Sequence, residues 1–106
     1  MQKQEKEILE LIRNRLSKNG GERVRRIILY GSRARGTASE ESDYDILVIE
    51  TDPVNKREEM RCLRNLFRDL SVPMDIRVMG EIEFEETKDV IGGLAFPANK
   101  YGVVLT

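Results

Sequence analysis

Two short segments of this chain carry residue types suited to phosphate chemistry, and the first is a Gly-Ser turn. Gly31 and Ser32 follow a hydrophobic run over 24–30 and precede Arg33 and Arg35. Glycine lets the backbone approach a ligand closely, and hydroxyl and guanidinium groups donate hydrogen bonds to phosphate oxygens. The segment matches neither a Walker A loop nor a dinucleotide fingerprint. We therefore predict a nucleotide-phosphate site at Gly31, Ser32, Arg33 and Arg35; the alternative is a solvated basic edge.

The second segment is a pair of carboxylates, Asp43 and Asp45, at the start of another hydrophobic run. Side chains alternate between the two faces of a strand, so both aspartates are expected on one face. Two like charges in that position are costly unless a cation lies between them. Mg²⁺ is commonly held by one or two carboxylates together with substrate phosphates. The pair therefore predicts a magnesium site, and the alternative is an ordinary surface Asp-x-Asp pair.

A third acid, Asp75, interrupts the apolar segment 74–79. If that strand neighbours the strand of Asp43 and Asp45, three carboxylates can hold two Mg²⁺ ions for in-line displacement at phosphorus. Asp75 is also the candidate general base. Arg77 is expected on the same strand face as Asp75. It forms a surface pair with Asp75, neutralises the carboxylates when metal is absent, or contacts the nucleotide; the sequence leaves these readings open.

The composition narrows the classes of function. The chain has 106 residues, a net charge of −1, 40% hydrophobic residues and 35% charged residues, which is typical of one globular domain over residues 1–106. It has no histidine, which excludes histidine zinc sites and Ser-His triads, and its single cysteine, Cys62, excludes an internal disulfide. We expect no direct nucleic-acid binding, no membrane span and no signal peptide. These features favour a cytoplasmic protein.

Hydrophobic periodicity predicts strands that alternate with helices, which favours an α/β (α+β) fold with a mixed β-sheet flanked by helices. Asp52 is the predicted N-cap of a helix that begins at Pro53. The apolar tail from residue 94 onward packs on the core or contacts a partner, and both readings stay open. The predicted elements are a helix over 2–18, a strand over 24–30, a short helix or turn over 32–38, a strand over 43–50, a helix over 53–70, a strand over 74–79, a helix over 81–91 and a last short strand over 103–105.

Taken together, these motifs resemble a known signature. The Gly-Ser pair, the ten residues that separate Ser32 from Asp43, the Asp-Tyr-Asp triplet and the later strand aspartate resemble the DNA polymerase β-like nucleotidyltransferase superfamily. The sequence Gly-Ser-Arg-Ala-Arg-Gly over 31–36 and Ser-Asp-Tyr-Asp-Ile-Leu-Val over 42–48 is similar to the minimal nucleotidyltransferase (MNT) branch. The resemblance implies the polymerase β-like fold in a minimal single domain, with ATP as substrate and Mg²⁺ as cofactor. It also implies that Asp43, Asp45 and Asp75 bind metal and that Gly31-Ser32 binds the nucleotide phosphates.

Many MNT proteins are antitoxins encoded beside a HEPN-domain toxin, a helical RNase, and they transfer AMP from ATP to a tyrosine of that toxin. The resemblance therefore implies a protein adenylyltransferase that acts on a HEPN toxin and forms a hetero-oligomer with it. Larger members of the superfamily hold DNA or a drug on additional domains. The sequence shows no such domain, so we expect the acceptor surface to come from a partner protein.

Two other functions compete with this one. The chain is either a non-catalytic antitoxin that neutralises its partner by covering it, or a transferase that acts on a small molecule or an RNA end. Intact Asp43, Asp45 and Asp75 argue against the first, and the absence of a broad basic face argues against the second.

Overall fold

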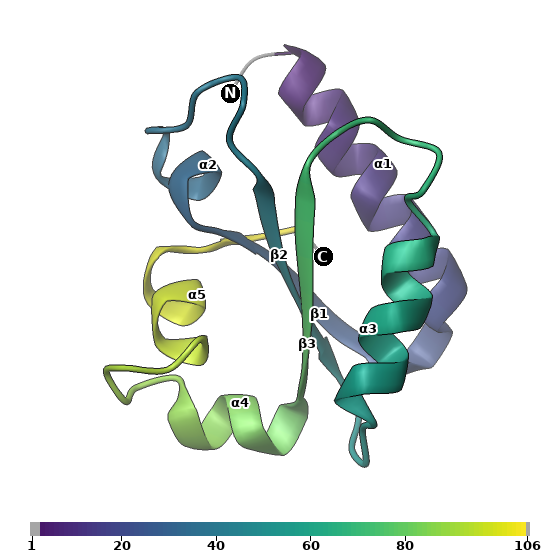
Figure 1. The fold of residues 1–106 in the computed structure, drawn as a ribbon. Coiled ribbons are helices and arrows are strands. Elements are labelled where there is room, and N and C mark those ends of the chain that lie inside the picture. Colours follow the sequence, from purple (N-terminus) through teal and green to yellow (C-terminus); the bar gives the residue numbers. More distant parts are fainter. Residues whose placement is uncertain (1–2, 106) are drawn as a thin grey trace.

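A four-stranded mixed β-sheet lies at the centre of the computed structural model, which describes residues 3–105 (Figure 1). In chain order the elements are α1 (Lys3–Gly20), the 3₁₀ helix η1 (Gly21–Arg23), β1 (Val24–Tyr30), α2 (Ser32–Arg35), β2 (Tyr44–Glu50), α3 (Lys56–Asn65), β3 (Met74–Gly80), α4 (Glu81–Thr87), α5 (Ala95–Tyr101) and β4 (Val103–Val104). The strand order across the sheet is β3-β2-β1-β4. β2 and β3 are parallel, whereas β1 is antiparallel to both β2 and β4. The predicted fold class is therefore confirmed.

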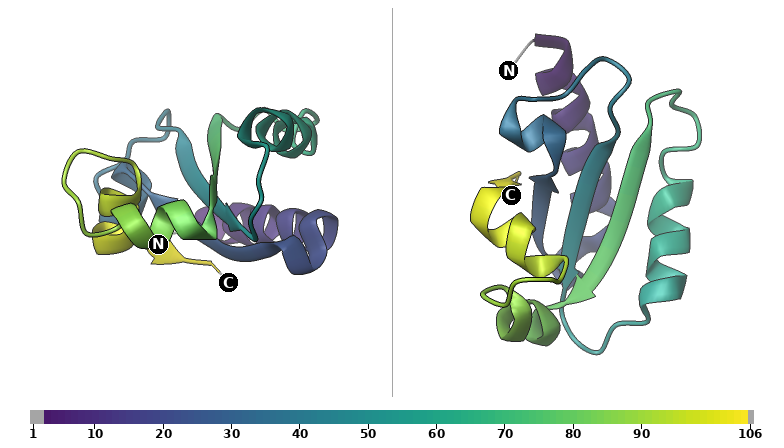
Figure 2. Two further views of the ribbon diagram at one scale, coloured as in Figure 1. Left: turned by 90° about the horizontal axis from the view of Figure 1, so that it is seen from below. Right: turned by 60° about the vertical axis from the view of Figure 1, so that its left-hand side comes forward.

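Helices cover both faces of this sheet (Figures 1 and 2). α1 and α3 lie on one side, and α4 and α5 lie on the other. α2 follows β1 at the end of the sheet, and its Ala34 packs against the hydrophobic cluster on the side of α1. Because both faces are covered, β2 is buried along almost its whole length, as its continuous apolar run over 46–49 requires. The strand that carries Asp45 is thus held rigidly in the middle of the molecule.

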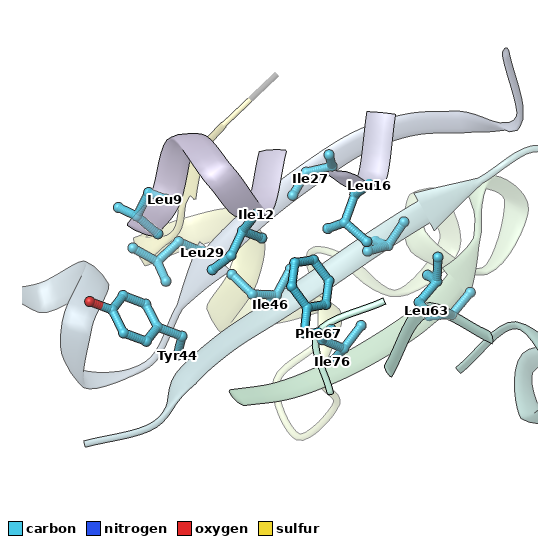
Figure 3. Packing of buried hydrophobic residues seen from close by; sticks show 12 residues of the cluster. Leu9, Ile12, Leu16, Ile27, Leu29, Tyr44, Ile46, Leu63, Phe67 and Ile76 are labelled. Carbon is cyan, nitrogen blue, oxygen red and sulfur yellow. The ribbon is translucent and has the colours of Figure 1, made fainter. Parts of the chain in front are cut away.

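The larger hydrophobic cluster fills the space between the sheet and the helices α1 and α3 (Figure 3). It draws one face from each strand, because side chains alternate along a strand. Its fully or nearly fully buried members are Leu9, Ile12, Leu16, Ile27, Leu29, Tyr44, Ile46, Val48, Leu63, Phe67, Ile76 and Val78. The smaller cluster lies on the opposite face and consists of Ile28, Leu47, Ile49, Met79, Phe84, Ala95 and Ala98.

The amphipathic pattern of the first helix is confirmed by its packing. Ile12 and Leu16 are fully buried against the sheet. The helix continues through Gly20, and Gly21 then takes a left-handed conformation with φ of +56°, which glycine adopts at little cost. The predicted helix start at residue 2 lies outside the described residues. Within residues 3–105 no helix is both long enough and apolar enough to cross a bilayer.

The helix that joins the parallel strands is shorter than predicted. A continuous helix over 53–70 is wrong, because α3 begins after Asn55 and ends at Asn65. The Asn55 side chain caps the helix by accepting a hydrogen bond from the backbone N–H of Glu58 at 3.2 Å. Residues 66–69 form tighter turns instead of a further α-helical turn.

Asp52 caps a different helix from the one predicted. Its Oδ2 atom accepts a hydrogen bond from the backbone N–H of Ile82 at 2.8 Å, in the first turn of α4. A Cβ atom on Gly80 would lie 2.3 Å from Oδ1 of Asp52, so this close contact requires glycine. Asp52 therefore links the segments that follow β2 and β3.

The tail holds a helix that the sequence did not predict, α5. Pro97 lies in its first turn, where the missing N–H has no partner to lose. Ala95 and Ala98 are buried against the sheet, which supports the reading of the tail as part of the core. The predicted last strand is confirmed as β4, which pairs with β1.

Candidate active site

Three polar side chains form a row across three neighbouring strands. Tyr30 of β1 is the register partner of Asp45 of β2, and Asp45 is the register partner of Asp75 of β3. Register partners project from the same face of a sheet, here the face of α4 and α5. The parallel pairing of β2 and β3 places both aspartates at the same end of the sheet. We call Asp45 and Asp75, the two acids of this row, the carboxylate row; Tyr30 lies beside it.

The Gly-Ser turn lies directly against this row. Gly31 has φ of +75° and ψ of −158°, a conformation that only glycine adopts readily. A Cβ atom on Gly31 would lie 2.2 Å from Oδ2 of Asp45, inside any permissible contact distance. Glycine is therefore required both for the turn and for the approach of the backbone to the carboxylate. Ser32 begins α2 immediately beyond this contact.

The charge around Asp45 is only partly compensated. Burial raises the pKa of the Asp45 carboxyl, and the nearby charges of Asp75 and Asp43 raise it further, while Arg77 opposes them. Asp43 lies exposed in the loop immediately before β2. Such a group of hard oxygen donors with excess negative charge fits a divalent cation. The predicted pair, Asp43 and Asp45, thus has the donor chemistry of a magnesium site.

Asp75 faces arginines in this structure. The Nε atom of Arg77 lies 3.3 Å from both carboxylate oxygens, and Nη2 of Arg64 lies 3.7 Å from Oδ1. The geometry supports the interpretation that Arg77 neutralises this carboxylate. Among residues 3–105 no three acidic, histidine or cysteine side chains gather closely enough to hold a metal. The expected three-carboxylate group of Asp43, Asp45 and Asp75 is therefore not assembled among these residues, and Asp75 is paired with Arg77 and Arg64 instead.

Arg33 is not placed at the predicted phosphate site. Its Nε donates to the carbonyl of Ser42 at 3.0 Å, and its Nη1 donates to Glu5 at 2.8 Å. Its Nη2 donates to the carbonyls of residues 39 and 40. The guanidinium group also stacks on the Tyr44 ring, 4.0 Å from the centroid. The prediction for Arg33 is corrected: its donors hold the loop that carries Asp43.

Arg35 is the arginine of the turn that stays exposed. Its guanidinium carbon lies 4.6 Å from the centroid of the Tyr101 ring on α5, which is a cation–π contact. Its backbone N–H donates to the carbonyl of Gly31 at 3.2 Å, so Arg35 lies one turn beyond the Gly-Ser pair. Gly31, Ser32 and Arg35 are thus the members of the predicted phosphate site that the structure brings together.

The sequence did not single out Tyr30 or Arg64 as parts of the site. Burial, together with the charges of Asp45 and Asp75, raises the pKa of the Tyr30 hydroxyl to about 12. The position of Tyr30 directly before Gly31 was a usable signal, because a strand that leads into the turn must end beside it. Nothing in the sequence indicated that Arg64 reaches Asp75 from α3.

Comparison with known proteins agrees with this geometry. A family model described as "Nucleotidyltransferase domain" matches residues 9–94. A protein of Methanocaldococcus jannaschii named "Putative protein adenylyltransferase" is 50% identical over 46 residues, which are 43% of this chain and 45% of that protein. The match thus spans less than half of the relative's length.

Two crystal structures of toxin–antitoxin pairs share the fold. One is the MntA–HpeT pair in a mutant form with two aspartates replaced by glutamate, with a TM-score of 0.65 and 19% identity. The other is a toxin–antitoxin with AMP-PNP, with a TM-score of 0.65 and 22% identity. Each alignment covers 92% of this chain and 72% of the other. Because the family model extends from α1 to the residue before α5, this chain belongs to the nucleotidyltransferase domain family.

Proposed function

We propose that this chain transfers AMP from ATP to a tyrosine hydroxyl of a partner HEPN toxin and acts as its antitoxin. The observation that carries the proposal is the contact between Gly31 and Asp45, which sets a phosphate-binding turn against carboxylates. The relative named as a protein adenylyltransferase and the toxin–antitoxin structures of the same fold support it. The proposal includes a cytoplasmic location and a hetero-oligomer with the toxin.

The nucleotide is proposed to bind with its phosphates on the Gly-Ser turn. The backbone at Gly31 permits close approach, and the Ser32 hydroxyl and the Arg35 guanidinium supply donors. Arg33 contributes indirectly, because it fixes the loop before Asp43. Its donors are already used by the protein, so we assign it no contact with phosphate.

Asp43, Asp45 and Asp75 are the residues that would hold Mg²⁺, with two ions proposed. When bound, the metal supplies positive charge for the phosphates and lowers the pKa of the acceptor hydroxyl. Asp75 would have to exchange its contact with Arg77 for the metal. Arg77 then becomes available to a negatively charged group close by.

The reaction is a substitution at the α-phosphorus of ATP. The acceptor hydroxyl oxygen forms a bond to this phosphorus, and the bond from phosphorus to the bridging oxygen of the β-phosphate breaks. Pyrophosphate leaves with that electron pair. Asp75, on the carboxylate row, is proposed to take the hydroxyl proton. Arg35 stabilises negative charge on the departing phosphates.

The test uses a HEPN-domain protein encoded beside this chain, co-expressed with the native chain or with the variant Asp43→Asn, Asp45→Asn. We expect the native chain to add AMP to a tyrosine of the toxin, and the variant to lose this activity with an unchanged circular dichroism spectrum. Intact-protein mass spectrometry and tryptic peptide mapping measure the adduct. The matched control is Glu40→Gln, Glu41→Gln, which removes two acids from the same loop.

An undiminished adduct with the double aspartate variant overturns the metal assignment. If that variant still suppresses toxicity but adds no AMP to the toxin, the result favours a non-catalytic antitoxin. Labelling of RNA or of a small molecule instead of the toxin favours the other transferase class.

A further inference from the structure

The outward side of α3 and of the turn after it carries four arginines, at positions 57, 61, 64 and 68. Spacings of four, three and four residues place side chains along one side of a helix. The arginines line a hollow of about 750 Å³ together with Met60. α3 packs beside β3 at the margin of the sheet, so this side is turned away from the core (Figure 2). We call the four arginines and Met60 the arginine face.

Few carboxylates neutralise the arginine face. Arg61 pairs with Glu58 on the same helix, and Arg64 contacts Asp75. Within the part of the chain that the structure describes, Arg57 and Arg68 form no ion pair and are exposed. The face therefore carries excess positive charge, although the net charge of the chain is −1.

The arginine face adjoins the carboxylate row. Nη2 of Arg64 lies 3.7 Å from Oδ1 of Asp75, the residue proposed to take the proton from the acceptor. Arg64 therefore links the arginine face to Asp75 around the edge strand β3.

The residue types of the arginine face favour a protein over a nucleic acid as its binding partner. Arginine and methionine are enriched in protein interfaces, and lysine is depleted. Met60 is half-buried and supplies apolar surface between the guanidinium groups. Glu58 lies within the hollow and Asp69 follows Arg68, so acids interrupt the positive charge that a phosphate backbone would follow. Guanidinium groups bind carboxylates in a bidentate manner.

We propose that the arginine face docks the acceptor protein, through a surface on which carboxylates surround an apolar side chain. This inference rests on the proposed function, because docking beside Asp75 serves the transfer to a partner. The recognition is electrostatic at its rim and apolar at Met60.

The test measures binding of three fluorescein-labelled probes by anisotropy at physiological salt. The probes are a 20-residue helical peptide with glutamates around a leucine stripe, the same peptide with glutamines, and a single-stranded RNA of 20 nucleotides. We expect the glutamate peptide to bind at least ten-fold more tightly than the other two. The variant Arg57→Gln, Arg61→Gln, Arg68→Gln should lose this preference. Arg64 is left intact because it contacts Asp75.

The matched control is Arg13→Gln, Arg25→Gln, Arg26→Gln, which removes the same charge from α1 and β1 and should keep the preference. Equal losses in both triple variants, or no preference for the glutamate peptide, overturn the proposal. If the RNA binds more tightly than the glutamate peptide, and the arginine variant abolishes that binding, the arginine face is a nucleic-acid surface and the protein-docking proposal is wrong. The variant Arg57→Glu, Arg61→Glu, Arg68→Glu should bind a version of the peptide in which lysines replace the glutamates.

The peptide-binding test and the AMP-transfer test distinguish failure of the docking surface from failure of the proposed function. The variant Asp43→Asn, Asp45→Asn should bind the glutamate peptide like the native chain. If AMP transfer to the toxin is absent but this peptide preference is present, the proposed function fails and the docking surface stands. If transfer is present and the arginine variant transfers AMP at the native rate, the docking surface fails alone.

Discussion

The guanidinium carbon of Arg35 lies 4.6 Å from the centroid of the Tyr101 ring, so the Gly-Ser turn and the last helix meet in a cation–π contact. The Tyr101 ring is 45% exposed, and Arg35 has its outer side open to solvent. The contact restricts where the guanidinium can lie. α5 therefore helps to position one donor of the proposed phosphate site.

Tyr101→Ala should weaken ATP binding by about two- to five-fold, the factor that corresponds to an exposed cation–π contact of about 0.5–1 kcal/mol. Tyr101→Phe keeps the ring and should keep the affinity. Isothermal titration calorimetry with ATP and with tripolyphosphate measures both. Asn99→Ala, on the same helix, is the control. An unchanged affinity in Tyr101→Ala would show that the contact does not position Arg35.

Arg33→Lys and Arg35→Lys should affect different properties, the first the stability of the fold and the second the affinity for ATP. Lysine cannot reproduce the fork of donors that Arg33 directs at the loop carbonyls and at Glu5, so Arg33→Lys should lower the free energy of unfolding by about 1–3 kcal/mol. Arg35→Lys should leave stability unchanged and weaken ATP binding. Urea denaturation and calorimetry on both variants measure the two effects. If the two variants behave alike, the separate roles given to these arginines are wrong.

Gly31→Ala should be more harmful than Gly36→Ala. Both glycines have positive φ, at +75° and +77°, but a Cβ on Gly36 would meet nothing within 4 Å. Gly36→Ala should therefore cost only the left-handed strain, about 1–2 kcal/mol. Gly31→Ala adds the clash with Asp45 and should cost about 3 kcal/mol or more, together with the loss of AMP transfer. Thermal denaturation measures this difference, and equal stabilities contradict the contact.

Glu50 should make the fold less stable at neutral pH and above than at acidic pH. Its side chain is fully buried, and burial, followed by the neighbouring Glu59, raises its pKa to about 7, while Arg23 opposes this. A carboxyl with a raised folded-state pKa favours folding while it is protonated. Stability is therefore complete below the ordinary value of 4.5 and falls as the pH rises to about 7.

The loss should amount to at most about 3.5 kcal/mol, since each pKa unit between the two values is worth about 1.4 kcal/mol. Glu50→Gln should flatten this dependence and raise the stability at pH 8. Urea denaturation between pH 4 and pH 9 provides the measurement. Glu41→Gln, in an exposed loop, is the control, and a native-like pH dependence in Glu50→Gln contradicts the assignment.

The sequence was sufficient to predict the parts of the site that depend on local rules. Alternation along a strand places Tyr44 and Ile46 in the core and Asp45 on the opposite face. The apolar runs define β1, β2 and β3, and the glycine before Ser32 marks the turn. The sequence left open whether the strands of Asp45 and Asp75 are neighbours, and the structure pairs these strands in parallel with the two aspartates in register.

The other features of the fold and the site depend on contacts between segments that are distant in the sequence, and a local sequence pattern cannot predict such contacts. Arg33 is held by Glu5, a residue of α1, and by carbonyls whose direction is set by the fold of the loop. Asp52 caps α4 because β2 and β3 end side by side, although its local sequence fits a cap of the next helix equally well. The tail helix α5 is short, so its stability comes from the packing of Ala95 and Ala98 on the sheet.

The hydrogen bond between Ile82 and Asp52 has a consequence for motion. It fastens the segments that leave β2 and β3, at the end of the sheet remote from Asp45 and Asp75. The opposite ends of the same strands continue into the loops over 36–43 and 70–73. This hydrogen bond therefore opposes local opening at the end of the sheet where β2 and β3 finish. The amide of Ile82 should accordingly exchange slowly with solvent, and β2 and β3 should keep their register there.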